Sequence, residues 1–161
     1  MGVRVGDIAP DFKLLSQASG EVSLSDFHGK KNVVLYFYPK DETPGCVREA
    51  RTFRDCYDVF EDKDTEVIGV SSDSTDSHRK FAEHHKLPFI LLSDPNRKLR
   101  KSYGVPSNFG LLPGRVTYVI DKEGRVRHIF NSQIRPERHI DEALKVLKEI
   151  EDQTSPTMND Q

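Results

Sequence analysis

The sequence is short of cysteine, with only Cys46 and Cys56 among its 161 residues. Two thiols cannot form the disulfide framework of a small secreted domain, and they cannot supply a cysteine-rich zinc site. Each thiol is therefore either an inert packing residue or a reactive group.

Long apolar runs and an excess of positive charge are also missing. The longest uninterrupted apolar run is the six residues 33–38, whereas a helix that crosses a bilayer needs about 20. Lys and Arg number 24 against 26 Asp and Glu, which gives a formal net charge of −2. We therefore expect no membrane-spanning segment and no nucleic acid partner, since nucleic acid binding needs clustered basic residues.

The N-terminus has no recognisable targeting signal. Residues 1–6 lack the apolar stretch of a secretory signal peptide, and Gly6 stands where a myristoylation signal has Ser or Thr. We therefore expect a cytoplasmic protein.

The pattern of apolar residues predicts alternating strands and helices. Four runs rich in β-branched and aromatic residues indicate buried strands, at residues 33–38, 66–71, 89–92 and 116–120. Helices are expected at residues 44–60, 75–85, 96–103 and 136–150. A turn at 121–124 leads into a further antiparallel strand at 125–130, and residues 11–24 can form an N-terminal hairpin around Ser19-Gly20. The sequence thus predicts an α/β fold with a central mixed sheet flanked by helices.

The length fits one domain, which we place at residues 1–150. Residues 151–161 contain Ser155-Pro156 and few apolar side chains, so we expect a disordered polar tail there.

Cys46 stands where the most apolar strand passes into a helix. Thr43 and Pro44 are residue types that precede and begin helices, which makes Cys46 the third helical residue. The nearby backbone N–H groups and the positive end of the helix dipole would favour its thiolate form. Cys46 also begins the stripe that faces the core, so a packing role is the alternative. The Thr-Pro-Gly sequence before it favours a reactive, partly exposed thiol.

The neighbours of Cys46 narrow the possible chemistry. A Cys-x-x-Cys pair is excluded, because Val47, Arg48 and Glu49 follow Cys46. A thiol hydrolase or acyltransferase would need a histidine base. The six histidines lie in segments rich in Lys, Glu and Arg, so most are expected at the surface, and they lack recognisable metal-ligand spacing. One of them could still fold back onto Cys46, which leaves hydrolysis open.

The segment Pro39-x-x-x-Thr43-x-x-Cys46 resembles the peroxidatic-cysteine motif of the peroxiredoxins. Further segments are similar to the peroxiredoxin Q (bacterioferritin comigratory protein) subfamily: residues 36–50, Phe53-Arg54-Asp55, Leu91-Leu92-Ser93-Asp94, Tyr103-Gly104-Val105 and residues 113–121. The resemblance spans about residues 5–150. It implies a thioredoxin-like fold, with reduction of hydroperoxides by the Cys46 thiolate and no metal, haem, flavin or other cofactor.

The resemblance also implies roles for three further residues. Pro39 would shield the sulfur, the Thr43 hydroxyl would bond to peroxide and thiolate, and the Arg115 guanidinium would support the thiolate and the leaving oxygen. The strand pattern agrees, because an antiparallel pairing of 116–120 with 33–38 would bring Arg115 to Cys46. The alternatives are an exposed loop arginine and a threonine that only caps the helix.

The sequence departs from the subfamily at position 51. Many members have a second cysteine five residues after the peroxidatic one, and here that residue is Arg51. Cys56 would lie about 15 Å from Cys46 along an intact helix, whereas a disulfide needs Cα atoms within roughly 7 Å. We therefore expect Cys56 to be a packing residue.

Recycling of Cys46 would then depend on an external thiol. We expect thioredoxin, glutaredoxin or a small thiol to reduce its sulfenic acid, in a monomeric protein. The missing second cysteine leaves one alternative function, a thioredoxin-fold binding or holdase module without peroxidase turnover.

Overall fold

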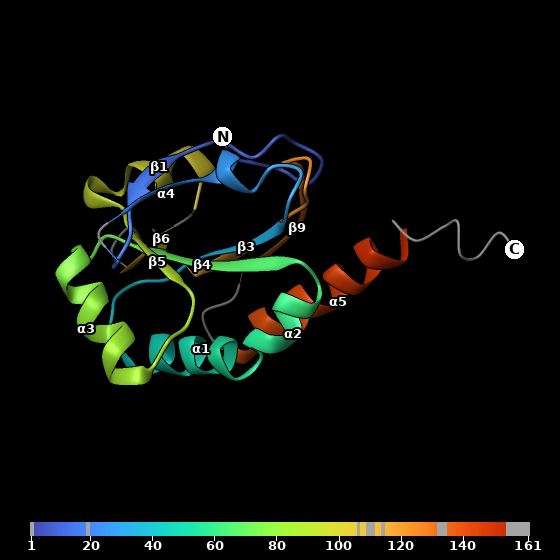
Figure 1. Cartoon of the computed structure of the whole chain (residues 1–161). Helices are drawn as coiled ribbons and strands as arrows, with labels where there is room; N and C mark the ends of the chain where they lie inside the picture. The colour runs from blue at the N-terminus through green and yellow to red at the C-terminus, as the bar shows by residue number, and fades with distance from the viewer. Residues whose placement is uncertain are drawn as a thin grey trace, which may run out of the picture.

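The computed structural model describes residues 2–18, 20–105, 107–108, 112–113, 115–131 and 135–153. A five-stranded mixed sheet lies across the middle of the molecule, with strands in the order β5-β4-β3-β8-β9 (Figure 1). In that order the strands are β5 (Ile90–Ser93), β4 (Thr65–Ser71), β3 (Asn32–Phe37), β8 (Val116–Ile120) and β9 (Val126–Asn131). The five strands expected from the sequence are confirmed, and their ends differ from the expected ones by at most one residue.

The central strand β3 sets the position of its neighbours. It pairs in parallel with β4 and antiparallel with β8, where Phe37 lies opposite Val116. All six residues of β3 are buried, as expected for a strand covered on both faces. The C-terminal end of β3 and the N-terminal end of β8 therefore lie side by side at the same end of the sheet.

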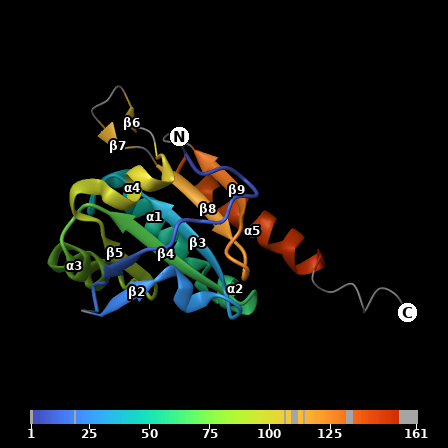
Figure 2. The same ribbon diagram turned by 90° about the horizontal axis from the view of Figure 1, so that it is seen from above.

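Helices cover both faces of the sheet. Beneath it in Figure 1 lie α1 (Pro44–Asp55), α2 (Tyr57–Asp62) and α5 (Glu137–Gln153), with α3 (Thr75–His85) at the β5 side. Above it lie α4 (Lys98–Tyr103) and the hairpin of β1 (Lys13–Leu15) with β2 (Glu21–Ser23), followed by a 3-10 helix at Leu24–Phe27. The N-terminal hairpin expected from the sequence is confirmed, with Ser19 outside the described residues. Figure 2 shows the short pair β6 (Ser107–Asn108) and β7 (Leu112–Pro113) beyond α4.

Alternate residues of β3 belong to two separate cores. Val34 and Tyr36 pack in the cluster that includes Cys46 and Phe53 of α1. The opposite face of β3 packs against α4 and the N-terminal segment, through residues such as Leu35. This alternation follows the period of two of a strand, and it gives α1 an apolar surface on which to lie.

Two helix boundaries differ from the sequence prediction. The helix expected at 44–60 is two helices, because Cys56 adopts φ −105° and ψ 8° and ends α1. The helix expected at 96–103 begins at Lys98, because Asn96 and Arg97 take left-handed conformations with φ 65° and 57°. A 3-10 turn at Pro95–Arg97 precedes it. Both differences arise in one or two residues that leave helical geometry.

The C-terminal helix α5 is longer than expected. It continues to Gln153, so the tail expected from residue 151 is helical over its first three residues, and residues 154–161 lie outside the described part of the chain. The single domain at residues 1–150 stays a prediction. Within the described ranges, no helix has both the length and the apolar character needed to span a bilayer.

Candidate active site

The loop from β3 into α1 places Cys46 in the first turn of the helix. Thr43 is extended, with φ −84° and ψ 149°, and Pro44 follows as the first helical residue. The amide of Val47 donates to the Thr43 carbonyl at 2.8 Å, which closes the first helical turn. The predicted helix start is therefore confirmed. The expected partial exposure of Cys46 is wrong, because only 1% of the residue is exposed.

Arg115 reaches Cys46 from the start of β8. The predicted antiparallel pairing of this strand with β3 is confirmed. The Arg115 Nη2 atom donates to Cys46 Sγ at 3.5 Å, and Nη1 donates to Glu49 Oε1 at 2.6 Å. Burial lowers the pKa of Arg115, but the charges of Glu49 and Cys46 outweigh burial and raise it. A permanently charged donor therefore lies against the sulfur, and it cannot serve as a general base.

Glu49 is a site residue whose position the sequence did not predict. It lies three residues after Cys46 in α1 and is fully buried. Burial raises the pKa of Glu49 to about 7, and the salt bridge from Arg115 opposes this rise. The spacing from Cys46 was a usable signal, since residues three apart lie on the same side of a helix.

His139 extends this buried polar group from α5. Its Nδ1 atom lies 3.6 Å from Glu49 Oε2 and 2.7 Å from the Thr117 hydroxyl. The sequence predicted that most of the six histidines lie at the surface, and the two that are fully buried are His139 and His78. The signal for His139 was its place on the apolar stripe of α5, four residues before buried Ala143.

Three buried polar atoms of the described residues near Cys46 make no hydrogen bond: Arg115 Nε, Glu49 Oε2 and the Tyr36 hydroxyl. Burial raises the pKa of Tyr36, and the charges of Glu49 and Cys46 add to the rise. A buried polar atom without a partner costs about 1–3 kcal/mol. These atoms can form hydrogen bonds with water or another small polar molecule.

A second buried polar group fixes the loop before α1. Asp41 accepts hydrogen bonds from the Tyr38 hydroxyl at 2.6 Å and the Ser77 hydroxyl at 2.8 Å. His78 Nδ1 lies 2.7 Å from the same carboxylate, and its Nε2 lies 2.9 Å from the Leu92 carbonyl. These contacts tie the loop to α3 and to the end of β5.

A second arginine supports the end of β3. Arg100 of α4 donates to the Tyr38 carbonyl at 3.2 Å, and its guanidinium lies 5.8 Å from the centre of the Phe37 ring. Burial lowers the pKa of Arg100 to about 10, so it stays a cation at neutral pH. No local pattern around Arg100 indicated that it faces the strand that leads to Cys46.

The other two predicted site residues lie on the same loop. The Thr43 hydroxyl donates to the Lys40 carbonyl at 2.8 Å and makes no capping hydrogen bond to the helix. Thr43 therefore caps α1 through its backbone alone. Pro39 is half-buried, two residues after the end of β3.

Cys56 differs from Cys46 in its surroundings. It is half-buried at the end of α1, ten residues after Cys46. Burial raises the pKa of Cys56, and Asp55 and Asp141 raise it further. These surroundings keep the Cys56 thiol protonated and therefore less reactive.

Comparison with known proteins agrees with this geometry. Residues 5–129 match the AhpC/TSA family. Peroxiredoxin Q of Sedum lineare is 54% identical over 149 residues, which cover 92% of this chain and 80% of the relative. Peroxiredoxin Q of Arabidopsis thaliana is 55% identical over 147 residues, which cover 91% and 68%. Both plant proteins are named as chloroplastic, so the cytoplasmic location expected from the N-terminus is wrong.

Solved structures point to the same family. Peroxidoxin BcpB of Mycobacterium tuberculosis has a TM-score of 0.85 and 34% identity, with 92% of this chain and 98% of that chain covered. PrxQ of Xylella fastidiosa has a TM-score of 0.83 and 30% identity, with 92% and 97% covered. The bacterioferritin comigratory protein of Xanthomonas campestris, studied for its alkyl peroxide reduction activity, has a TM-score of 0.81 and 27% identity, with 91% and 96% covered. The chain therefore belongs to the AhpC/TSA family, in its peroxiredoxin Q group, and is a thiol-dependent peroxidase with a thioredoxin-like fold.

Proposed function

We propose that Cys46 is the thiol that reduces the peroxide. The observation that carries this proposal is the hydrogen bond from Arg115 to Cys46 Sγ at 3.5 Å, inside a buried site. The positive charge of the guanidinium favours the thiolate, and the first turn of α1 adds the positive end of the helix dipole. Cys56 has neither feature, because it lies at the other end of α1.

The reaction begins when the Cys46 thiolate attacks one peroxide oxygen. A sulfur–oxygen bond forms as the oxygen–oxygen bond breaks, so sulfur loses two electrons and the peroxide gains them. The products are the Cys46 sulfenic acid and an alkoxide or hydroxide, which takes up a proton to become an alcohol or water. Negative charge moves from sulfur to the leaving oxygen, so the barrier falls where a fixed donor lies close to both atoms.

We assign this donor role to Arg115. Glu49 holds Nη1 at 2.6 Å, and this contact orients Nη2 toward the sulfur. The guanidinium is planar, so fixing one nitrogen fixes the direction of the others. Glu49 is thus a positioning residue, while Arg115 acts on the reacting atoms.

Thr43 and Pro39 complete the proposed site. We assign the Thr43 hydroxyl to the incoming peroxide, which it would meet after turning from the Lys40 carbonyl, now 2.8 Å away. Pro39, half-buried in the loop, would limit the access of water to the sulfur. Thr43→Val should therefore slow the oxidation of Cys46, whereas Thr43→Ser should retain most of the rate.

We propose that an external thiol recycles the enzyme. The sulfenic acid condenses with a thiol to give a mixed disulfide and water, and a second thiol then releases Cys46 as the free thiol. Arg51 occupies the position of the usual second cysteine, and α1 separates Cys46 from Cys56. Thioredoxin, glutaredoxin or a small thiol can supply the reducing equivalents.

We also make proposals on the substrates, the assembly and the location, and the same comparison supports those on substrates and location. We propose that both hydrogen peroxide and organic hydroperoxides are reduced, since the related Xanthomonas campestris protein was studied with alkyl peroxides. We propose that the protein is a monomer. We also propose that it acts in a plastid, because the plant relatives are named as chloroplastic. Light scattering after gel filtration tests the monomer, and immunodetection in isolated plastids tests the location.

One experiment tests both the reactive residue and its recycling. The reduced chain is treated with one equivalent of hydrogen peroxide and then with dimedone, and the products are measured by mass spectrometry. We expect one dimedone adduct at Cys46, an equal adduct in Cys56→Ser, and none in Cys46→Ser. A rapid loss of two hydrogens without an adduct would show a Cys46–Cys56 disulfide and contradict the one-cysteine cycle. An adduct that persists in Cys46→Ser would contradict the assignment of Cys46.

A further inference from the structure

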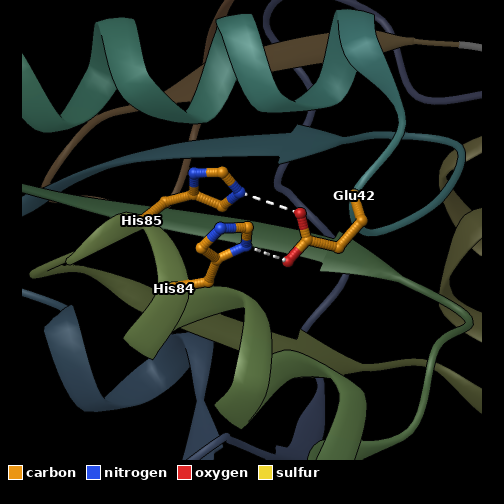
Figure 3. A group of neighbouring side chains, drawn as sticks. All are labelled: Glu42, His84 and His85. Atoms are coloured by element: carbon orange, nitrogen blue, oxygen red, sulfur yellow. Dashed lines mark hydrogen bonds and ion pairs between the residues drawn. The ribbon is translucent and has the colours of Figure 1, made fainter.

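A group of three potential metal ligands lies outside the proposed active site, at the surface between the β3–α1 loop and α3. Glu42 belongs to the loop, while His84 and His85 belong to the last turn of α3. Figure 3 shows both imidazole rings turned toward the carboxylate of Glu42. His84 Nδ1 lies 2.9 Å from Glu42 Oε2, and His85 Nε2 lies 2.8 Å from Glu42 Oε1. We call these residues the Glu42–His84–His85 cluster.

The geometry of the cluster is close to that of a metal site. One ligand atom from each of the three residues lies within 4.8 Å of the other two. Zinc is bound by imidazole nitrogen and carboxylate oxygen at about 2.0–2.2 Å, so ligand atoms in a tetrahedral site lie about 3.3 Å apart. The present nitrogen–oxygen distances of 2.8 and 2.9 Å run to the two different oxygens of Glu42. With all three ligand atoms within 4.8 Å of one another, the separations would have to change by about 1.5 Å at most. Such small shifts are within reach of side chains at the surface.

The exposure of the cluster suits a metal site in which one coordination position is open to water. The side chains of His84 and Glu42 are 66% and 45% exposed, whereas that of His85 is 11% exposed. His85 is held by Phe81, with the two ring centres 5.2 Å apart. One ligand is thus fixed, two can adjust, and water can occupy the fourth position.

The charges around the cluster act in both directions. Glu42 contributes a carboxylate, which both imidazoles contact. The C-terminal end of α3 adds the negative end of its dipole. Arg54 opposes a cation, since it donates to the His85 carbonyl at 2.9 Å. Its charge is balanced in turn by Asp55, whose carboxylate lies 2.9 Å from the Arg54 guanidinium.

We propose that Glu42, His84 and His85 bind one divalent transition metal ion of the zinc type. The ligand atoms are a carboxylate oxygen of Glu42, Nδ1 of His84 and Nε2 of His85. Each imidazole would bind through an unprotonated nitrogen, so the metal would replace the present hydrogen bonds between the two rings and the carboxylate.

The metal would also restrain the loop that leads to Cys46. Glu42 immediately precedes Thr43, the N-cap residue of α1. The left-handed backbone conformation of Glu42, with φ 64°, sets the direction of the loop. Cys46 is buried, so a protein or small thiol can reach its sulfenic acid only after the loop and the first turn of α1 move. A metal that joins Glu42 to α3 should slow that step. This second part rests on the function proposed above.

Metal binding is tested without reference to peroxidase activity. Zinc chloride is titrated by calorimetry into the full chain carrying Cys46→Ser and Cys56→Ser, so that thiols cannot bind the ion. We expect one equivalent to bind, with affinity at least tenfold weaker in His84→Ala and in Glu42→Gln. The matched control is His128→Ala, which removes a histidine 2.9 Å from another carboxylate, Glu142, and should leave the affinity unchanged.

Two results would overturn the site. The first is the absence of saturable binding at one equivalent near pH 7.5. The second is equal affinity in His84→Ala and His128→Ala. Cobalt(II) gives an independent reading, because a tetrahedral site produces visible absorption bands that should disappear in Glu42→Gln. Circular dichroism of each variant verifies that the fold is retained.

The effect on the loop has a separate test. The Cys46 sulfenic acid is formed in the chain with native Cys46, and its reduction by a thiol is timed with and without zinc, with His84→Ala as the matched variant. We expect zinc to slow this reduction several-fold in the native chain and not in His84→Ala. Equal rates with and without zinc would contradict the restraint of the loop. Failure to form the sulfenic acid at all would instead contradict the proposed function.

Discussion

Arg115→Ala separates the chemical role of this arginine from its structural role. The guanidinium donates to Glu49 at 2.6 Å and to Cys46 Sγ at 3.5 Å, so its removal affects both a buried carboxylate and the sulfur that we propose to react. A fixed donor aimed at developing charge contributes about 3 kcal/mol to a barrier. We therefore expect Cys46 oxidation to slow about a hundredfold.

The loss of stability in Arg115→Ala should depend on pH through Glu49. The pKa of Glu49 in the folded chain, about 7, lies above the ordinary value of 4.5 for a glutamate. The folded state therefore binds the proton more tightly, and the resulting stability is present at low pH and lost as the pH rises through the folded pKa. Without Arg115 that pKa rises further. The free energy of unfolding of Arg115→Ala should be close to that of the parent at pH 6. Above pH 7 the difference between the two should grow by about 1.4 kcal/mol per pH unit.

A second substitution distinguishes the two effects. Glu49→Gln removes the carboxylate that Arg115→Ala leaves buried without its partner, so the double variant should recover most of the lost stability at pH 8. It should not recover the rate, because the guanidinium is still missing. Urea unfolding at pH 6 and pH 8, in a Cys46→Ser background, measures stability, and competition with a haem peroxidase measures the rate with native Cys46. The matched control is Arg48→Ala. It removes an exposed arginine of α1 that pairs with Glu137 at 3.0 Å.

Two outcomes would refute this reasoning. A near-normal rate in Arg115→Ala would show that the guanidinium does not act on the reacting atoms. Recovery of the rate in the double variant would show that Arg115 only neutralises Glu49.

Substitution of two glycines gives further predictions. A Cβ at Gly45 would lie 3.0 Å from Arg115 Nη2. Gly45→Ala should therefore displace the guanidinium and slow peroxide reduction about tenfold, with little loss of stability. An unchanged rate would show that the position of Arg115 is not critical. A Cβ at Gly69 would lie 2.9 Å from Tyr36 Cζ, in the core, so Gly69→Ala should lower the free energy of unfolding by about 1–3 kcal/mol. Thermal unfolding measures this loss, with Gly20→Ala as the control because a Cβ at Gly20 meets nothing within 4 Å; equal melting temperatures would contradict the packing argument.

The sequence alone determined most of the helices and strands and the place of Cys46 among them. Runs of β-branched and aromatic residues predicted the strands, because a strand buried on both faces needs apolar side chains at every position. Thr43 and Pro44 predicted the start of α1, and hence the helical position of Cys46, because a helix start depends on a few adjacent residues. The segments from Pro39 to Cys46 and beyond were sufficient to indicate the family.

Apart from the contact of Arg115 with Cys46, which the expected strand pairing indicated, only the tertiary structure decided which distant residues meet. Arg115 and Glu49 are 66 positions apart, and His84 and Glu42 are 42 apart. Local patterns cannot give such pairs, because the register of the sheet and the packing of the helices bring them together. Burial is a property of the same packing, so the sequence suggested a partly exposed Cys46 where the fold encloses it. Polar residues such as His139 are tolerated in the core because the fold supplies their partners there.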